Sequence, residues 1–152
     1  MPVDLNQKLS EHFSLSEFVS SQTASRKGID NTPSQEVVER LRKLCTDILE
    51  PARVALGPMR ISSGFRCEKL NVAIGGSKTS AHCKGYAADV IPFDVSRREF
   101  ARWVKDHCNF DQIILEFGTP ENPDWIHVSN EPRFRKQVLR TANGGGYVAI
   151  NI

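Results

Sequence analysis

Apolar positions at helical spacing follow three short polar segments of the chain. The segments SLSE at 14–17, TPSQ at 32–35 and SRRE at 96–99 each place Ser or Thr three residues before Glu or Gln. This pattern is typical of the first turn of a helix, because both side chains bond backbone N–H groups that lack a helical partner. We expect Thr32 to cap the second helix, with Pro33 at its first position.

The second of these helices is expected to be the main helix of the core. Its apolar residues recur at helical spacing, and they are Val37, Val38, Leu41, Leu44, Cys45, Ile48 and Leu49. Pro51 removes a backbone donor, so the helix is expected to bend or break there and to end at Gly57 and Pro58. The helix after 96–99 carries Phe100, Trp103, Val104 and His107 on one face. It is expected to pack on a sheet.

Five short runs rich in β-branched and aromatic residues predict strands. They are MRISS at 59–63, YAADVIP at 86–92, FDQIILEF at 110–117, DWIHVS at 124–129 and QVLRT at 137–141. Helices come first along the chain and most strands come later, which favours the α+β class. We therefore expect one domain over residues 1–152, with N-terminal helices packed on a mostly antiparallel sheet.

Composition and charge exclude several classes of protein. The net charge is only +2, and the basic residues are scattered, so we expect no nucleic-acid partner. No apolar run reaches membrane-spanning length, and the first 20 residues contain no signal-peptide pattern. The sequence thus predicts a protein made in the cytoplasm without a signal peptide. A monomer is expected, although no pattern in the sequence determines the oligomeric state. Four dispersed cysteines are expected to be reduced.

The stretch TSAHCKGYAADV at 79–90 carries candidate metal ligands. His82 lies in a loop and Asp89 in the strand that follows, while His127 lies in the middle of the strand 124–129. A catalytic zinc ion takes three protein ligands and leaves one position for water, and these three residues have suitable side chains. Spacing alone leaves a second interpretation open, because a single histidine in a strand is often an ordinary core residue.

A family resemblance extends over residues 9–130. It rests on SGFR, LN, IGG, SAH, GYAAD and WIHVS, in that order, and on the N-terminal pattern HFSLSEFVSSQTASRKGIDNTP. In these motifs the chain resembles the zinc peptidases of the D-alanyl-D-alanine carboxypeptidase and L-alanyl-D-glutamate endopeptidase family, which have the hedgehog/DD-peptidase fold. It is similar above all to small phage and prophage members. The combination of motifs is highly specific.

The resemblance implies a role for each matching residue. His82, Asp89 and His127 would be the ligands of Zn²⁺. Arg66, in SGFR, would orient the substrate or stabilise the oxyanion, a role that suits the fixed geometry and permanent charge of a guanidinium group. Ser80 would contact the substrate near the metal. A structural ion pair for Arg66 and a backbone contact for Ser80 remain open alternatives.

The general base is expected to be Asp124, three residues before His127, where the family has Glu or Asp. Strict strand alternation would place Asp124 on the face opposite His127, so the assignment requires the strand to begin after Asp124 or to carry a bulge. Glu121 and Glu116 are the alternative bases, because a base must lie within reach of the attacking water.

The resemblance also implies the reaction, which is hydrolysis of an amide bond in the stem peptide of peptidoglycan. We expect an L-Ala-D-Glu endopeptidase that acts on the bacterial cell wall as a phage or prophage endolysin. Such a protein would be released by a holin or delivered with a phage particle. A D-Ala-D-Ala carboxypeptidase or dipeptidase is one alternative. A non-catalytic zinc-containing module that binds the wall or serves a phage structure is another.

Overall fold

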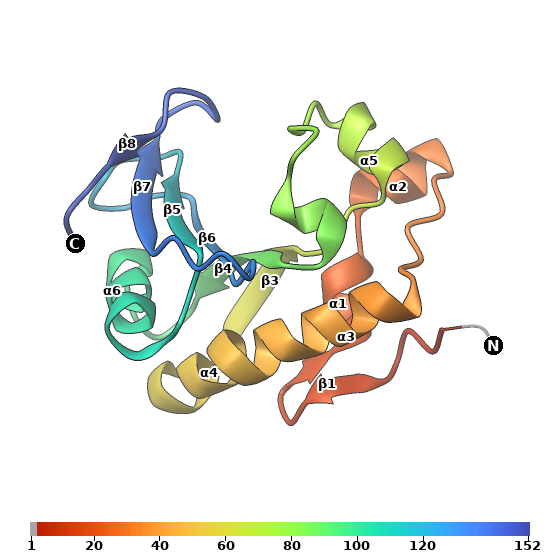
Figure 1. The fold of residues 1–152 in the computed structure, drawn as a ribbon, viewed down its shortest axis with the longest axis horizontal. Coiled ribbons are helices and arrows are strands. Elements are labelled where there is room, and N and C mark those ends of the chain that lie inside the picture. The colour runs from red at the N-terminus through yellow and green to blue at the C-terminus, as the bar shows by residue number, and fades with distance from the viewer. Residues whose placement is uncertain (1–2) are drawn as a thin grey trace.

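The computed structural model describes residues 3–152 and has a six-stranded sheet at its centre (Figure 1). The sheet order is β3-β4-β6-β5-β7-β8. These strands are β3 Met59–Ser63, β4 Ala87–Pro92, β6 Trp125–Ser129, β5 Gln112–Glu116, β7 Gln137–Thr141 and β8 Val148–Ala149. Every neighbouring pair is antiparallel except β5 and β7, which are parallel. The predicted α+β class, with helices and a mostly antiparallel sheet, is confirmed.

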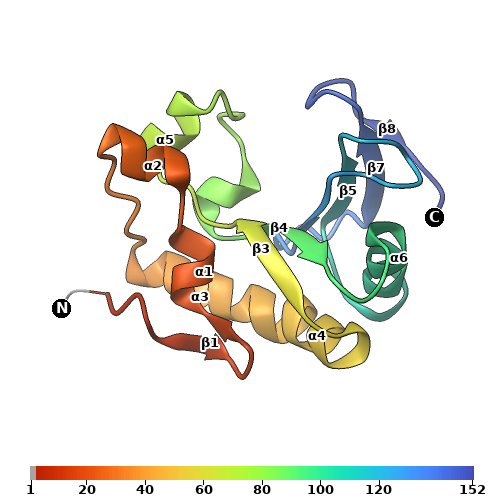
Figure 2. The same cartoon turned by 180° about the vertical axis from the view of Figure 1, so that it is seen from behind.

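One face of the sheet forms the hydrophobic core. Alternate residues of the three central strands are fully buried there, and they are Ala88, Val90, Ile113, Leu115, Ile126 and Val128. Helix α6, Arg97–His107, packs against β4, β5 and β6, and helix α3, Gln35–Leu44, contributes buried Val38, Leu41 and Leu44 to the same core (Figures 1 and 2). Because side chains alternate along a strand, the remaining positions of β4, β5 and β6 face the other side.

Two of the three predicted helix starts are confirmed. Helix α1, Leu15–Val19, begins after Ser14, whose backbone N–H donates to the Glu17 carboxylate at 2.7 Å. Helix α6 begins after Ser96, whose hydroxyl accepts from the Glu99 N–H at 3.0 Å. In both cases a local side-chain contact determines where the helix begins.

The predicted cap of the core helix was wrong by two residues. The cap of α3 is Ser34, whose hydroxyl accepts from the Val37 N–H at 3.2 Å. The hydroxyl of Thr32 instead donates to the Asp30 carboxylate at 2.6 Å, and the Thr32 N–H donates to the same oxygen at 3.0 Å. Asp30 thus engages Thr32 in a tight turn, and Pro33 precedes the helix rather than opening it.

The expected interruption near Pro51 is a widened turn within a continuous helix. Helix α3 runs into a π-helical turn, η1 Cys45–Leu49, and then into α4, Glu50–Leu56. In η1 the Glu50 N–H bonds the carbonyl of Cys45, five residues earlier. The wider spacing fits the missing donor of Pro51, because the regular four-residue bond cannot form there. Gly57, at φ 92°, ends the helix as predicted.

Several short elements were not predicted from the sequence. They are the hairpin β1 Lys8–Ser10 and β2 Phe13–Ser14, the helices α2 Gln22–Lys27 and α5 Glu68–Ala73, the 3₁₀ turn η2 Ala81–Lys84 and the strand β8 Val148–Ala149. Figures 1 and 2 both show α5 beside α2, on the side of the sheet away from α6. Among residues 3–152, no helix has the length and apolar character needed to cross a membrane.

Candidate metal centre and catalytic site

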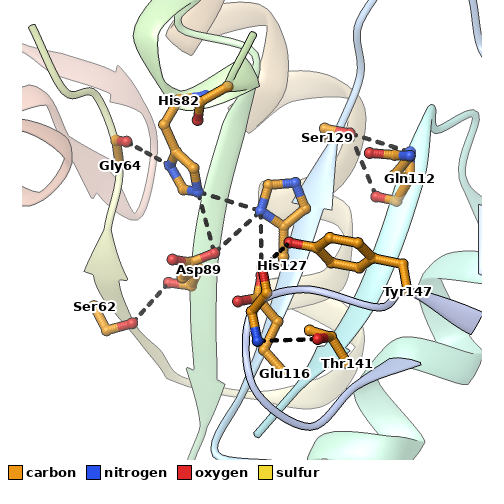
Figure 3. Close-up of polar contacts among 12 residues, drawn as sticks. Ser62, Gly64, His82, Asp89, Gln112, Glu116, His127, Ser129, Thr141 and Tyr147 are labelled. Carbon is orange, nitrogen blue, oxygen red and sulfur yellow. Dashed lines mark hydrogen bonds and ion pairs between the residues drawn. The ribbon is translucent and has the colours of Figure 1, made fainter. Parts of the chain in front are cut away.

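Two of the predicted metal ligands face each other across neighbouring strands. Asp89 of β4 is the direct partner of His127 of β6, and their Oδ1 and Nδ1 atoms lie 3.2 Å apart. His82, from the turn η2, brings its Nε2 atom to 3.3 Å from Asp89 Oδ1 and 3.2 Å from His127 Nδ1. All three residues are buried (Figure 3). The structure therefore brings together the three residues that the sequence singled out.

The backbone around η2 orients His82. Its Nδ1 atom lies 2.7 Å from the carbonyl oxygen of Gly64, and its backbone N–H donates to the hydroxyl of Ser80 at 3.3 Å. A carbonyl oxygen only accepts, so the Nδ1 atom carries the proton and the Nε2 atom directs a lone pair at the other two residues. The same arrangement is typical of a histidine that ligates a metal through Nε2.

The charges in the cluster favour a cation at its centre. Burial alone would raise the pKa of Asp89, but the two imidazoles hold this pKa below its usual value. Asp89 is thus a carboxylate that shares a small space with the lone pair of His82 Nε2. A proton on His127 Nδ1 could point at either Asp89 Oδ1 or His82 Nε2, but not at both. A metal ion can instead bind the Asp89 oxygen and both histidine nitrogens at once.

The spacing of the three donor atoms fits zinc. Zinc bonds of about 2.0–2.1 Å to nitrogen and oxygen put the ligands of a tetrahedral ion roughly 3.3–3.4 Å apart. The observed separations are 3.2, 3.2 and 3.3 Å, so the donors form one face of such a tetrahedron. Two nitrogens and one oxygen are also a donor set that zinc accepts, with the fourth position left for water.

Glu116 is the acidic residue that lies against this cluster. It ends β5, two residues after Ile114, which is the direct partner of His127. Its Oε1 atom lies 3.8 Å from His127 Nδ1 (Figure 3). Burial and the negative charge of Asp89 raise the pKa of Glu116 to about 7, although His127 and Arg66 act in the opposite direction. A carboxyl group with a pKa near neutrality can both accept and return a proton.

Asp124 lies outside these contacts. Strand β6 begins at Trp125, so Asp124 precedes it, as its proposed role required. Its side chain is nevertheless exposed and lies beside Gly118 of the preceding turn, where an added Cβ would meet Asp124 Oδ1 at 3.1 Å. Glu121 is also exposed. Within residues 3–152, neither carboxylate bonds to a member of the cluster.

Arg66 and Ser80 are in contact with each other at the entrance of η2. The Arg66 Nη2 atom donates to the Ser80 hydroxyl at 3.0 Å, and Ser80 caps the turn that carries His82. Within the described part of the chain, the buried Nε–H of Arg66 has no protein partner. No carboxylate pairs with the guanidinium in residues 3–152, so its charge is available to a bound group.

Most of the chain matches the model of a known protein family. The model described as Peptidase M15 matches residues 11–129, which include all of these site residues. The chain belongs to the Peptidase M15 family. No curated protein sequence gives a significant match. Peptidases of this family depend on zinc and act on peptidoglycan, so this M15 protein is a zinc-dependent peptidoglycan peptidase.

The matched region ends before the last part of the site. Tyr147 lies beyond residue 129, after three glycines, and its ring is directed toward Glu116 and His127 (Figure 3). Partial burial and the negative charges of Glu116 and Asp89 raise the pKa of its hydroxyl. Sequence analysis missed this residue, because its position depends on the loop between β7 and β8. The three glycines in front of it were the only local signal.

Proposed function

We propose that this M15 peptidase cuts the L-Ala-D-Glu bond of the peptidoglycan stem peptide and acts as an endolysin of a phage or prophage. The observation that carries the hydrolytic part is the triangle of His82, Asp89 and His127, with Glu116 at 3.8 Å from His127. The preference for this bond and for a phage role rests on the likeness of the motifs to small phage members. The cell wall, reached by holin-dependent release or with a phage particle, is its proposed place of action.

The three ligands would hold the zinc ion, which supplies Lewis-acid chemistry by polarising the scissile carbonyl and lowering the pKa of a water toward ~7. The Glu116 carboxylate accepts the proton of the attacking water and then returns it to the nitrogen of the leaving amine. Burial has already raised its pKa to about 7, which suits both steps. Glu116 therefore replaces Asp124 as the proposed base.

Arg66 has the complementary role of holding negative charge. Its buried Nε–H has no partner among residues 3–152, and Ser80 holds one end of its guanidinium at 3.0 Å. A guanidinium fixed in this way can bond a substrate carboxylate or the oxygen that gains charge as the carbonyl is attacked. Ser80, which also bonds the N–H of His82, would link the substrate contact to the ligand loop.

The test is digestion of purified muropeptides, read by mass spectrometry. Three samples are compared: the zinc-loaded protein, the protein with chelator, and the chelated protein after zinc is restored. Products split between L-Ala and D-Glu, lost with chelator and regained with zinc, would support the endopeptidase. Loss of a terminal D-Ala alone would instead identify a carboxypeptidase. Intact muropeptides after incubation with folded, zinc-loaded protein would favour a wall-binding or structural module.

A further inference from the structure

A groove of about 800 Å³ runs along the outer strand of the sheet. We call it the β3 groove. Residues 59–63 form one wall, and the opposite walls come from residues 20–23 and Arg26 around α2 and from Leu70 and Ile74 at α5. None of the three metal-ligand candidates lines it. It is therefore a surface adjacent to the metal centre and distinct from it.

The groove exposes a free strand edge. β3 is the terminal strand of the sheet, and all five of its residues line the groove, although their side chains alternate between the two faces. A groove that touches every residue of a strand follows its backbone edge. Across residues 3–152, the backbone of β3 bonds to no segment other than β4. Such an edge pairs readily with an extended peptide.

The groove carries a net positive charge, which favours an acidic peptide. Arg26, Arg60 and Arg66 all line it, against one acidic residue, Glu17. The Glu17 carboxylate is already bonded to the N–H of Ser14 at 2.7 Å. Among the described residues, neither Arg26 nor Arg60 forms an ion pair. The groove therefore presents uncompensated positive charge to whatever occupies it, which favours an anionic ligand.

The groove leads to the metal centre through two residues. Ser63, at the end of β3, is the direct partner of Asp89, and Arg66 lines the groove while it bonds Ser80 of the ligand loop. Arg60 pairs with Ile91, two positions from Asp89 along β4, so its side chain is on the same face of the sheet as Asp89. A peptide along β3 can thus continue into the site.

We propose that the β3 groove binds the carboxylate-bearing part of the substrate as an added strand on β3, with Arg26 and Arg60 receiving its carboxylates. This inference rests on the proposed function, because it takes the stem peptide as the occupant. Stem peptides carry free carboxylates and are extended chains, so they match the charge of the groove and its open edge. Substrate recognition then extends beyond the residues next to the cut bond.

The first test reverses the charge of the groove. The double variant Arg26→Glu/Arg60→Glu is compared with Arg102→Glu, an exposed residue of α6 outside the groove. On a stem peptide with free carboxylates, the double variant is expected to raise KM by about tenfold or more, and the control is expected to stay within about twofold. On the same peptide with amidated carboxylates, the two proteins are expected to differ little. Equal KM values on the acidic peptide would overturn the proposal.

The second test addresses strand addition itself. A series of stem peptides is prepared, each with one backbone N-methyl group at a different position. Each methyl group removes one backbone hydrogen-bond donor of the peptide, while the protein stays unchanged. Affinity for the Glu116→Gln protein, which should not cleave them, is expected to fall at alternate positions. Uniform affinities would rule out pairing with β3. Because binding is measured without turnover, the result holds even if the unmodified protein cuts a different bond or none, which would contradict only the proposed function.

Discussion

Asp89 and His127 are direct cross-strand partners, and their ligand atoms lie 3.2 Å apart. A metal centre built on paired strands has little freedom to rearrange, so each ligand should matter for zinc affinity. We expect His82→Ala, Asp89→Ala and His127→Ala each to lose stoichiometric zinc, and with it the stabilisation that zinc gives the folded protein. Metal analysis and thermal unfolding with and without zinc would measure both effects. Full zinc content in all three variants would contradict the assignment.

Substitutions of Glu116 and Asp124 distinguish these two candidate bases by their effects on kcat. Glu116→Gln keeps the size of the side chain but cannot accept a proton, so kcat should fall by about 10²-fold or more, with zinc retained. Asp124→Asn is the matched control, and we expect its kcat to stay within about threefold of the unmodified protein. Steady-state rates on one muropeptide, normalised to bound zinc, would compare the two variants. The reverse order of effects would return the role to Asp124.

Arg66 and Ser80 should act as a coupled pair. Arg66→Lys keeps the charge but loses the planar fork, so we expect kcat/KM to fall by about tenfold or more. Ser80→Ala removes the hydroxyl that contacts both Arg66 and the N–H of His82. Because the residues are in contact, the double variant should lose less than the sum of the two single losses in activation free energy. Strict additivity would show that the two side chains act separately.

Asp111 should make the stability of the protein depend on pH. Its buried carboxylate accepts from the Arg135 backbone N–H, Nε and Nη2 at 2.9, 2.9 and 2.7 Å. Burial would raise the pKa of Asp111, but these bonds hold it below the ordinary value. The stabilisation is therefore fully present above the unfolded pKa of about 3.9 and is lost as the pH falls through the folded pKa.

The matching variant is Asp111→Asn, with the exposed Asp106→Asn as its control. At pH 7 we expect Asp111→Asn to lower the free energy of unfolding by about 2 kcal/mol, a value typical of hydrogen bonds to a charged group. The difference from the unmodified protein should shrink below about pH 4. Urea unfolding of the metal-free proteins at both pH values would measure it, and a constant difference would contradict the role of Asp111.

The sequence predicted those parts of the fold that depend on local signals. The strands β3 and β7 have the expected bounds, and the Ser14 and Ser96 caps are confirmed. The elements that it missed depend on distant contacts. The amide of Asn31, for example, donates to the carbonyl oxygens of Val19 and Phe65, both at 3.0 Å, and so joins three segments that have no common pattern.

The site residues also fall into those that the sequence could predict and those that it could not. The three ligand candidates could be recognised because their motifs are continuous in sequence, and the structure brings them together. The sequence pointed to Asp124 as the base, whereas the proposed base is Glu116. This choice depends on the register of β5 against β6 and on the direction of a side chain just before a strand, and the motifs carry neither. Tyr147 could not be found either, because a loop after β7 carries it toward the cluster.

The parallel strand β7 has a consequence for solubility. It lies beyond the matched region and covers the outer edge of β5, where Glu116 is paired with Thr141. Without residues 137–149, β5 would become an uncovered apolar edge at the opposite end of the sheet from β3. A longer open edge at this end could pair with other copies of the chain, whereas the present terminal strand, β8, has only two residues. We therefore expect the C-terminal hairpin to limit self-association, and it keeps the strand of Glu116 in the interior of the sheet.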